Sequence, residues 1–326
     1  MTIEYLKKAA KTPATGEDET RETVATMLSE IEAGGEDKAR EYGEKLDGWS
    51  GDIVAGKDAI AAAAEKVPDQ LKDDLRFAYD RVRGFAEQQK NSFGEFETEL
   101  SPGLWAGQRL IPMETAGCYV PGGRYAHVAS AIMSITTAKV AGVDNVIACS
   151  APSQERGGIH PAILYAMDLC GADHILALGG VQGIAAMAFG LFTGKKANIL
   201  AGPGNRFVAE AKRMLFGRVG IDLFAGPTEI LIIADGAADP EIVATDLVGQ
   251  AEQHGPDSPA WLVTTSRHLA EDVMARMGGL IEALAEVRKL SWIDQKRLVL
   301  VGKSEGGMAV SDYGGEGFIA HIIMAY

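Results

Sequence analysis

Short apolar runs alternate with segments of helical spacing from about Leu110 onward, and this alternation limits the fold more than any other feature. The runs are bounded by turn residues and are apolar throughout, as expected for strands buried on both faces of a parallel sheet. Because crossovers between parallel strands are right-handed, this order predicts a doubly wound parallel α/β sheet. The strand and helix pairs are NVIACSAP with HPAILYAMDLCG, HILALGG with QGIAAMAFGLF, and ANILAGPGN with RFVAEAKRMLFG.

The alternation resumes after Thr228 and predicts a second sheet. Its expected strands are the run at residues 230–234, taken as buried on both faces, then AWLVTTS and RLVLVG, with a helix at about residues 269–284. The N-terminal part differs, because ETVATMLSEIEAGG and DQLKDDLRFAYDRVRGFAEQQ carry apolar residues three and four apart. These stretches predict outer helices.

Composition excludes several classes of protein. The formal charge of -14 argues against a nucleic-acid partner, since phosphate binding needs concentrated Lys and Arg. No apolar run approaches the roughly 20 residues that span a bilayer, and the N-terminal sequence lacks the apolar core of a signal peptide. Cys118, Cys149 and Cys170 show no CxxC spacing and are expected to be reduced and buried. We therefore expect a cytoplasmic protein without a zinc thiolate site.

Three glycine-rich turns after predicted strands are the first candidates for a ligand site. They are GCYVPGGRYAH at 117–127, GGVQG at 179–183 and GPGN at 202–205, and none of them is GxGxxG. A tight strand-to-helix turn would explain any one of them alone. Together, at the carboxyl ends of parallel strands, they favour a ligand with a phosphate bound by free helix N–H groups, a dinucleotide being one option.

The helix predicted after residue 238 ends in two polar side chains suited to a metal ion. Asp239 is its expected N-cap and Pro240 its first residue. Gln250 and His254 are four apart and project from one face, where an amide oxygen and an imidazole can bind a cation such as zinc. The alternative is a solvated polar helix end.

Four motifs together resemble those of a known family: METAGCYVPGGRYAH, LGGVQGIAAMAFG, GPGNRFVAEAKR, and AGPTEILIIAD followed by DLVGQAEQHGPDS. Their order and approximate spacing are similar to those of histidinol dehydrogenases, over essentially all of residues 20–300. Members of this family are zinc-dependent NAD enzymes that oxidise an alcohol through an aldehyde to an acid. The resemblance implies NAD and zinc as cofactors, a small-molecule alcohol as substrate, and a homodimer.

The resemblance also implies a domain organisation. The family has two incomplete Rossmann-like domains, and an N-terminal helical arm is expected before them. Residues 1–20 are assigned to the arm, 21–117 together with 228–326 to a first, discontinuous α/β domain, and 118–227 to a second α/β domain that binds NAD.

By motif, Tyr119, Gln182 and Asn205 match family positions that contact NAD, and Thr228 matches a substrate-contacting Ser. Without the resemblance, each of the first three has a simpler explanation, as a core aromatic, a helix cap and an N-cap respectively.

Gln250 and His254 match the family's zinc ligands, with one departure. The family reads QAEH where this chain reads QAEQH, so the ligand spacing grows from three to four. The added residue turns one ligand by about 100° on a regular helix. Gln253 is therefore an alternative ligand, although His254 keeps the following GPDS in register.

The GGRYAH segment bears on the choice of substrate. Arg124 and His127 supply a planar cation and a second donor, which suit a sulfonate, carboxylate or phosphate group. The segment is similar to family members that oxidise dihydroxypropanesulfonate to sulfolactate, whereas histidinol carries no anionic group. The alternatives are L-histidinol as substrate and a surface ion pair for Arg124.

The C-terminal sequence departs from the family. DYGGEGFIAH aligns Glu316 with the family's water-activating Glu, but Gly317 stands where the general-base His is expected. The following FIAHIIMAY lacks the family's further Asp and His ligands, and His321 is interpreted as a structural residue. Two hypotheses of different class follow: an enzyme of the family, or a truncated, non-catalytic NAD-binding homologue.

Overall fold

The computed structural model describes residues 3–7, 17–122, 126–223, 229–254, 260–288 and 320–325. Contacts between Cα atoms divide the chain into two compact units. The larger unit is Asp18–Gly226, and the smaller unit combines Met1–Glu17 with Pro227–Tyr326. Both units contain a sheet with packed helices, in agreement with the predicted α/β fold class.

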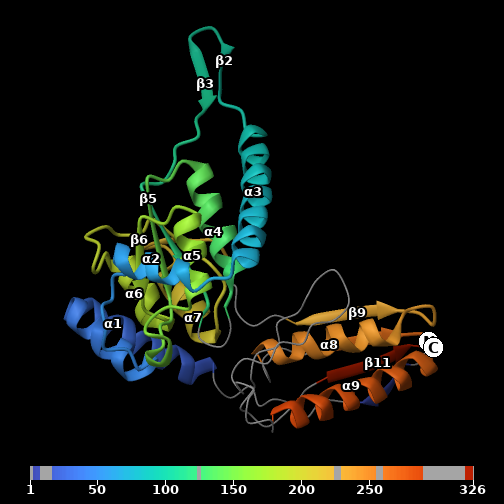
Figure 1. Ribbon diagram of the computed structural model, residues 1–326. Helices are drawn as coiled ribbons and strands as arrows, with labels where there is room; N and C mark the ends of the chain where they lie inside the picture. Colours follow the sequence, from blue (N-terminus) through green and yellow to red (C-terminus); the bar gives the residue numbers. More distant parts are fainter. Residues whose placement is uncertain are drawn as a thin grey trace. The chain divides into compact units, whose positions relative to one another are not determined.

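A five-stranded parallel sheet forms the centre of the larger unit (Figure 1), in the order β6-β5-β4-β7-β8. From β4 the chain moves outward through β5 to β6, and then returns to β7 and β8 on the other side of β4. This reversal confirms the doubly wound topology and puts the switch point between β4 and β7. The strands are β4 (Thr115–Tyr119), β5 (Asn145–Ser150), β6 (His174–Ala177), β7 (Ile199–Ala201) and β8 (Gly220–Ile221).

Each face of this sheet carries its own hydrophobic core. In β5, Ile147 and Cys149 face one core, whereas Val146 and Ala148 face the other. Helices α1, α6 and α7 line the first core, and α2 to α5 line the second. The helices are α1 (Glu17–Tyr42), α2 (Lys57–Glu65), α3 (Asp69–Asn91), α4 (Val128–Ala141), α5 (Pro161–Leu169), α6 (Gly180–Phe189) and α7 (Arg206–Leu215).

The N-terminal helices differ from the predicted domain division, which grouped 21–117 with 228–326. In the structure α3 packs on α4 and α2 packs on α5, so these residues belong to the same compact unit as 118–226. Ala63 and Leu75 are buried in the core that also holds Ile135 and Ile163. The helices therefore complete one face of the five-stranded sheet, because their apolar stripes are buried there.

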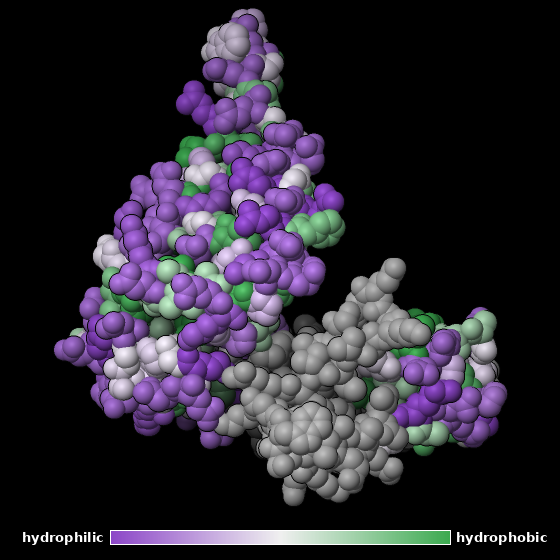
Figure 2. Space-filling model, viewed as in Figure 1, coloured by the Kyte–Doolittle hydropathy of each residue, from purple (hydrophilic) through white to green (hydrophobic). Residues whose placement is uncertain are grey.

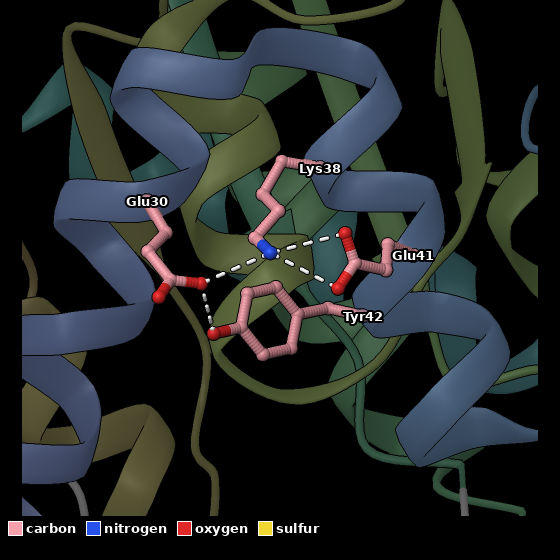
Figure 3. A network of polar contacts seen from close by, with 4 residues as sticks. All are labelled: Glu30, Lys38, Glu41 and Tyr42. Carbon is pink, nitrogen blue, oxygen red and sulfur yellow. Dashed lines mark hydrogen bonds and ion pairs between the residues drawn. The ribbon is translucent and has the colours of Figure 1, made fainter.

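A kink at Gly35 divides α1, and a polar network joins the two parts (Figure 3). Gly35 has a positive φ of 62°, a value that favours glycine. Lys38 Nζ lies 3.0 Å from Glu41 Oε1 and 3.2 Å from Glu30 Oε2, and the Tyr42 hydroxyl donates to Glu30 Oε2 at 2.8 Å. The hydrogen bond from Tyr42, followed by that from Lys38, lowers the pKa of Glu30. The network thus links Glu30, before the kink, to three residues after it.

We predict opposite effects for two glycine-to-alanine substitutions in these helices. Gly35→Ala places a Cβ on a left-handed residue and lowers the free energy of unfolding by about 1–2 kcal/mol. Gly84→Ala, inside α3 with no atom within 4 Å of the added Cβ, raises it by about 0.5–1 kcal/mol. Urea unfolding followed by circular dichroism measures both, and a Gly35→Ala protein as stable as the wild type would contradict the kink assignment.

The smaller unit holds a four-stranded sheet of order β1-β11-β10-β9. Strands β9, β10 and β11 are parallel, and β1 pairs antiparallel to β11. Helices α8 and α9 pack together over one face, where Leu247, Leu262 and Val273 are fully buried. The elements are β1 (Ile3–Lys7), β9 (Ile230–Ala234), α8 (Pro240–His254), β10 (Ala260–Thr264), α9 (Arg267–Arg288) and β11 (Ala320–Ala325).

Strand β9 was predicted correctly in position but wrongly in burial. Leu231 is exposed and 77% of Ile233 is accessible, so its side chains alternate between core and solvent. The reason is that the described helices cover only one face of this sheet. Residues 1–20 also differ from a purely helical arm, since Ile3–Lys7 is a strand and α1 begins at Glu17. The predicted strand RLVLVG lies outside the described residues.

A β-hairpin between α3 and β4 has no counterpart in the sequence-based prediction. It consists of β2 (Phe96–Ser101) and β3 (Leu104–Gln108), paired antiparallel, and extends beyond the end of α3 (Figure 1). All of its residues are exposed.

Two further predictions can be compared with the described residues. Cys118, Cys149 and Cys170 are free and buried, as predicted, and burial raises their thiol pKa values. No helix in the described part of the chain is long and apolar enough to cross a membrane.

Candidate active site

The carboxyl ends of β4 and β7 meet at the switch point, where ligands bind in open α/β sheets. Gly202, directly after β7, has a φ of 116°, and a Cβ built on it would lie 2.0 Å from the carbonyl oxygen of Tyr119. Tyr119 is the last residue of β4. Only glycine therefore allows the two strand ends to approach this closely.

Hydrogen bonds and an ion pair hold the GPGN turn that follows β7. Lys212 is fully buried and its ammonium group donates to the Gly202 carbonyl at 2.9 Å and to the Asp222 carboxylate. Asp222 also accepts from the Gly202 N–H at 2.8 Å. Sequence reasoning missed this pair. The sequence feature that could have revealed the pair is the position of Lys212 on the apolar stripe of α7, beside Val208, Ala211 and Leu215.

Asn205 ends this turn as the N-cap of α7. Its side-chain oxygen accepts from the N–H groups of Phe207 at 3.0 Å and Val208 at 3.1 Å. The Asn205 side-chain oxygen is thus the N-cap that the sequence offered as an explanation, while the side-chain nitrogen keeps its capacity to donate. The capped N–H groups do not serve as the free anion site expected of a glycine-rich turn.

The turn before α6 is held by an acidic side chain from the N-terminal helices. Asp47, at the end of the π-helix η1 (Gly43–Asp47), accepts through Oδ2 from the Gly179 N–H and from Gln182 Nε2, both at 2.9 Å. The Gly180 N–H donates to the Tyr119 hydroxyl at 3.2 Å. Tyr119, Gln182 and Asp47 thus form one cluster, which brings two of the three predicted NAD contacts together. The Gly179 and Gly180 N–H groups, which the sequence predicted to bind phosphate, are therefore bonded to the side chains of Asp47 and Tyr119.

Burial dominates the electrostatics of this cluster. It raises the pKa of Asp47, although the hydrogen bonds from Gly179 and Gln182 act in the opposite direction. Burial also raises the pKa of Tyr119, so its phenol stays neutral and keeps a proton to donate. Sequence reasoning missed Asp47, because it lies more than a hundred residues from Gly179 and no local motif marks it.

Gln182 carries an unused acceptor in this cluster. Its side chain is 1% exposed, and Oε1 has no hydrogen-bond partner among the described residues, whereas Nε2 is engaged by Asp47. Buried polar atoms are almost always paired, so an unpaired oxygen calls for a partner. The Tyr119 phenol proton and Gln182 Oε1 are thus a donor and an acceptor that lie in one cluster.

The remaining predicted residues fall in different parts of the chain. His127 is half-buried directly before α4, while Arg124, Thr228 and Glu316 lie outside the described residues. Gln250 is half-buried in α8 of the smaller unit, and that helix continues through Gln253 to His254. Residues 250 and 254 are thus one helical turn apart.

The described residues only partly fit a zinc ion. They contain no group of three or more His, Cys, Asp or Glu side chains that could hold a metal. Gln250 and His254 are two donors, whereas zinc usually takes three or four protein ligands. A complete site would need donors from outside the described ranges.

A parallel doubly wound sheet with polar side chains at its switch point is the arrangement of nucleotide-binding α/β enzymes. Comparison with known proteins narrows this class. The sequence profile named Histidinol dehydrogenase matches residues 10–321, and the chain belongs to that family. Members of the family are NAD-dependent oxidoreductases that act on CH–OH groups.

Individual relatives agree with this assignment. The chain is 54% identical to "Sulfopropanediol 3-dehydrogenase" of Ruegeria pomeroyi over 316 residues, which is 96% of this chain and 72% of that protein. It is 56% identical to "Histidinol dehydrogenase homolog" of Pelagibacter ubique, covering 96% and 74% of the two chains. The crystal structure of histidinol dehydrogenase from Elizabethkingia anophelis superposes with a TM-score of 0.73 at 34% identity, over 84% of this chain and 62% of that one.

Substitutions at Asp47 test the cluster. Asp47→Ala leaves the Gly179 N–H and the Gln182 amide without their acceptor, which lowers the free energy of unfolding by about 2–4 kcal/mol. Asp47→Asn keeps an acceptor oxygen and costs less. Urea unfolding of both variants at neutral pH gives the comparison, and equal losses would argue against the acceptor role.

The pH dependence follows from the raised pKa of Asp47. A carboxyl group with a higher pKa in the folded state stabilises the fold when protonated, and this contribution is lost as pH rises through the folded pKa. The stability of the wild type relative to Asp47→Asn therefore falls between about pH 4, near the ordinary Asp pKa, and neutral pH. Urea unfolding across this range measures the difference, and a constant difference would exclude the shift.

Proposed function

We propose that this protein is an NAD-dependent alcohol dehydrogenase that oxidises 2,3-dihydroxypropane-1-sulfonate to sulfolactate. The observation that carries the proposal is the 54% identity, over 96% of the chain, to a protein named for sulfopropanediol oxidation. Arg124 and His127 in GGRYAH add a chemical reason, because a guanidinium group pairs with a sulfonate through parallel N–H donors.

The reaction has two oxidation steps. The alcohol loses a hydride and a proton to give an aldehyde, and the hydrated aldehyde loses a second hydride and a proton to give the acid. NAD, when bound, supplies the hydride acceptor for each step. The complete conversion therefore consumes two NAD and one water for each alcohol.

We assign NAD contacts to Tyr119, Gln182 and Asn205. The support is the hydrogen-bonding capacity that these side chains keep: the Tyr119 phenol proton, the Asn205 amide nitrogen, and Gln182 Oε1, which has no partner among the described residues. Thr228 is assigned to the substrate by its motif. Glu316 is assigned to take a proton from the water that adds to the aldehyde.

Gln250 and His254 are proposed as zinc ligands on α8, with Gln253 as the alternative to His254. Zinc, when bound, polarises the substrate oxygen. We further propose that the protein is a homodimer, as the family resemblance implies. The runner-up substrate is L-histidinol, which the named Elizabethkingia anophelis structure and its 34% identity favour.

Substrate choice can be tested by following NADH formation with each alcohol. We expect turnover with dihydroxypropanesulfonate, and a loss in kcat/KM of about 100-fold in Arg124→Ala, since a charge-assisted hydrogen bond contributes about 1.5–3 kcal/mol. NAD affinity should be unchanged. Arg76→Ala, on the exposed surface of α3, is the matched control and should behave as the wild type. Turnover with L-histidinol alone would move the protein to the runner-up function.

The cofactor assignment has its own test, independent of the substrate. Gln182→Leu removes the unpaired oxygen and Tyr119→Phe removes the phenol proton, and each should weaken NAD binding about 10-fold, the effect of one hydrogen bond. Tyr165→Phe, on α5, removes a hydroxyl from another part of the same unit and is the control. Calorimetric titration with NAD measures the three affinities. Unchanged affinity in both site variants would refute the assignment.

A further inference from the structure

Asp47 differs from a typical acidic residue of this chain in where its carboxylate lies. Hydrophilic residues, in purple in Figure 2, cover most of the visible face of the larger unit. Asp47 is instead half-buried at the end of η1, and its carboxylate reaches the start of α6. Among the described residues it bonds to the Gly179 N–H and to Gln182 Nε2 and forms no ion pair. Burial of a carboxylate without a cation costs free energy, so its place calls for an explanation.

The backbone on both sides of Asp47 is held against strand β6 and the residue that follows it. On one side, Gly43 is buried at the start of η1, and a Cβ built on it would lie 3.0 Å from Cδ2 of Leu178. On the other side, the Ala177 N–H donates to the Ile53 carbonyl at 2.7 Å. The position of Asp47 is therefore set by the packing of the larger unit.

One oxygen of Asp47 makes both of its bonds. Oδ2 accepts from the Gly179 N–H and from Gln182 Nε2, each at 2.9 Å. The first bond ties down the backbone before α6, and the second holds a side chain. A carboxylate oxygen can only accept, so the amide atom of Gln182 that faces Asp47 must be the nitrogen. The amide oxygen of Gln182 is consequently directed away from Asp47.

Gln182 Oε1 lies beside a glycine and keeps its accepting capacity. A Cβ built on Gly180 would lie 3.2 Å from Oε1, so a side chain there would cover this oxygen. Gln182 is 1% exposed, and Oε1 has no hydrogen-bond partner among the described residues. Because an amide oxygen only accepts, a ligand group that bonds to it must be a donor. In NAD the donors are hydroxyl, amino and carboxamide groups, and the phosphate oxygens are excluded.

The two ends of a glutamine amide are nearly equal in size, and rotation about its last torsion is only weakly restricted. Sterics alone therefore do not decide which end of the Gln182 amide faces a ligand. With the nitrogen turned toward the ligand, a donor would meet a donor. The hydrogen bond to Asp47 is the interaction that selects the accepting orientation.

We propose that Asp47 is a positioning residue for the cofactor, whose carboxylate holds the Gln182 amide with Oε1 toward a donor group of NAD. Asp47 acts through Gln182 and needs no contact with NAD itself. The inference rests on the NAD contact proposed above for Gln182, and it adds the side chain that makes this contact selective for a donor.

A double-mutant cycle on NAD binding tests the proposal. Calorimetric titration measures the affinities of the wild type, Gln182→Leu, Asp47→Leu and the double variant. Leu has the branched shape of Asp and keeps water out of the place of the carboxylate. We expect each single substitution to weaken NAD binding about 10-fold, the effect of one hydrogen bond. The double variant should also lose only about 10-fold, whereas independent effects would multiply to about 100-fold. Circular dichroism at the titration temperature verifies that each variant is folded.

Two further variants separate positioning from a general effect on the fold. Asp47→Asn should bind NAD as tightly as the wild type, because one amide oxygen can take the place of Oδ2 and accept both bonds. Glu36→Leu is the control, since Glu36 Oε1 accepts from the Phe192 N–H at 2.7 Å beyond the other end of α6. It removes the same charge and one bond to a backbone N–H, and it should leave NAD affinity unchanged.

The possible failures are distinguishable. Multiplied losses in the double variant, or a loss in Glu36→Leu as large as that in Asp47→Leu, would overturn the positioning role. Wild-type affinity in Asp47→Leu beside a weakened Gln182→Leu would also overturn it and would leave the NAD contact of Gln182 standing. Wild-type affinity in Gln182→Leu would remove that contact and this inference together.

Discussion

The backbone contact between Gly202 and Tyr119 is the constraint on which the candidate site depends. It brings the carboxyl ends of β4 and β7 together at the switch point, and a side chain at Gly202 would collide with the Tyr119 carbonyl group. The Lys212 and Asp222 pair holds Gly202 by both its carbonyl and its N–H group. The positions of Tyr119 and Asn205 therefore follow from a close backbone approach, which is stabilised by an ion pair between the buried Lys212 and Asp222.

Asp47 adds a second tie, from the N-terminal helices to the same edge of the sheet. Its carboxylate accepts from the Gly179 N–H at the start of α6 and from the Gln182 amide nitrogen, and Gln182 Oε1 has no partner in the part of the chain that the structure describes. The helices of residues 18–91 consequently shape the site as well as cover the sheet. Their membership of the larger unit follows from the burial of their apolar faces in its two cores.

Local pattern was sufficient for much of the fold. Continuous apolar runs identified β5, β6, β7, β9 and β10, because a strand that is buried consists mostly of apolar residues. Gly and Pro residues marked the ends of these strands. The hairpin was missed although Pro102-Gly103 is a turn signal, because its strands mix Glu, Thr and Gly with isolated apolar residues. The exposed side chains of β9 were also mispredicted, since an apolar run does not reveal whether both faces of its sheet are covered.

The sequence by itself determined the family, the parallel α/β class and the candidate residues Tyr119, Gln182 and Asn205, because motifs and periodicity are local properties of the chain. The tertiary structure alone decided which N–H groups at the glycine-rich turns are already paired. It also decided that Asp47 reaches Gly179, and that the N-terminal helices join the larger unit. These features depend on contacts between residues far apart in the sequence, and such contacts are set by the packing of the whole unit.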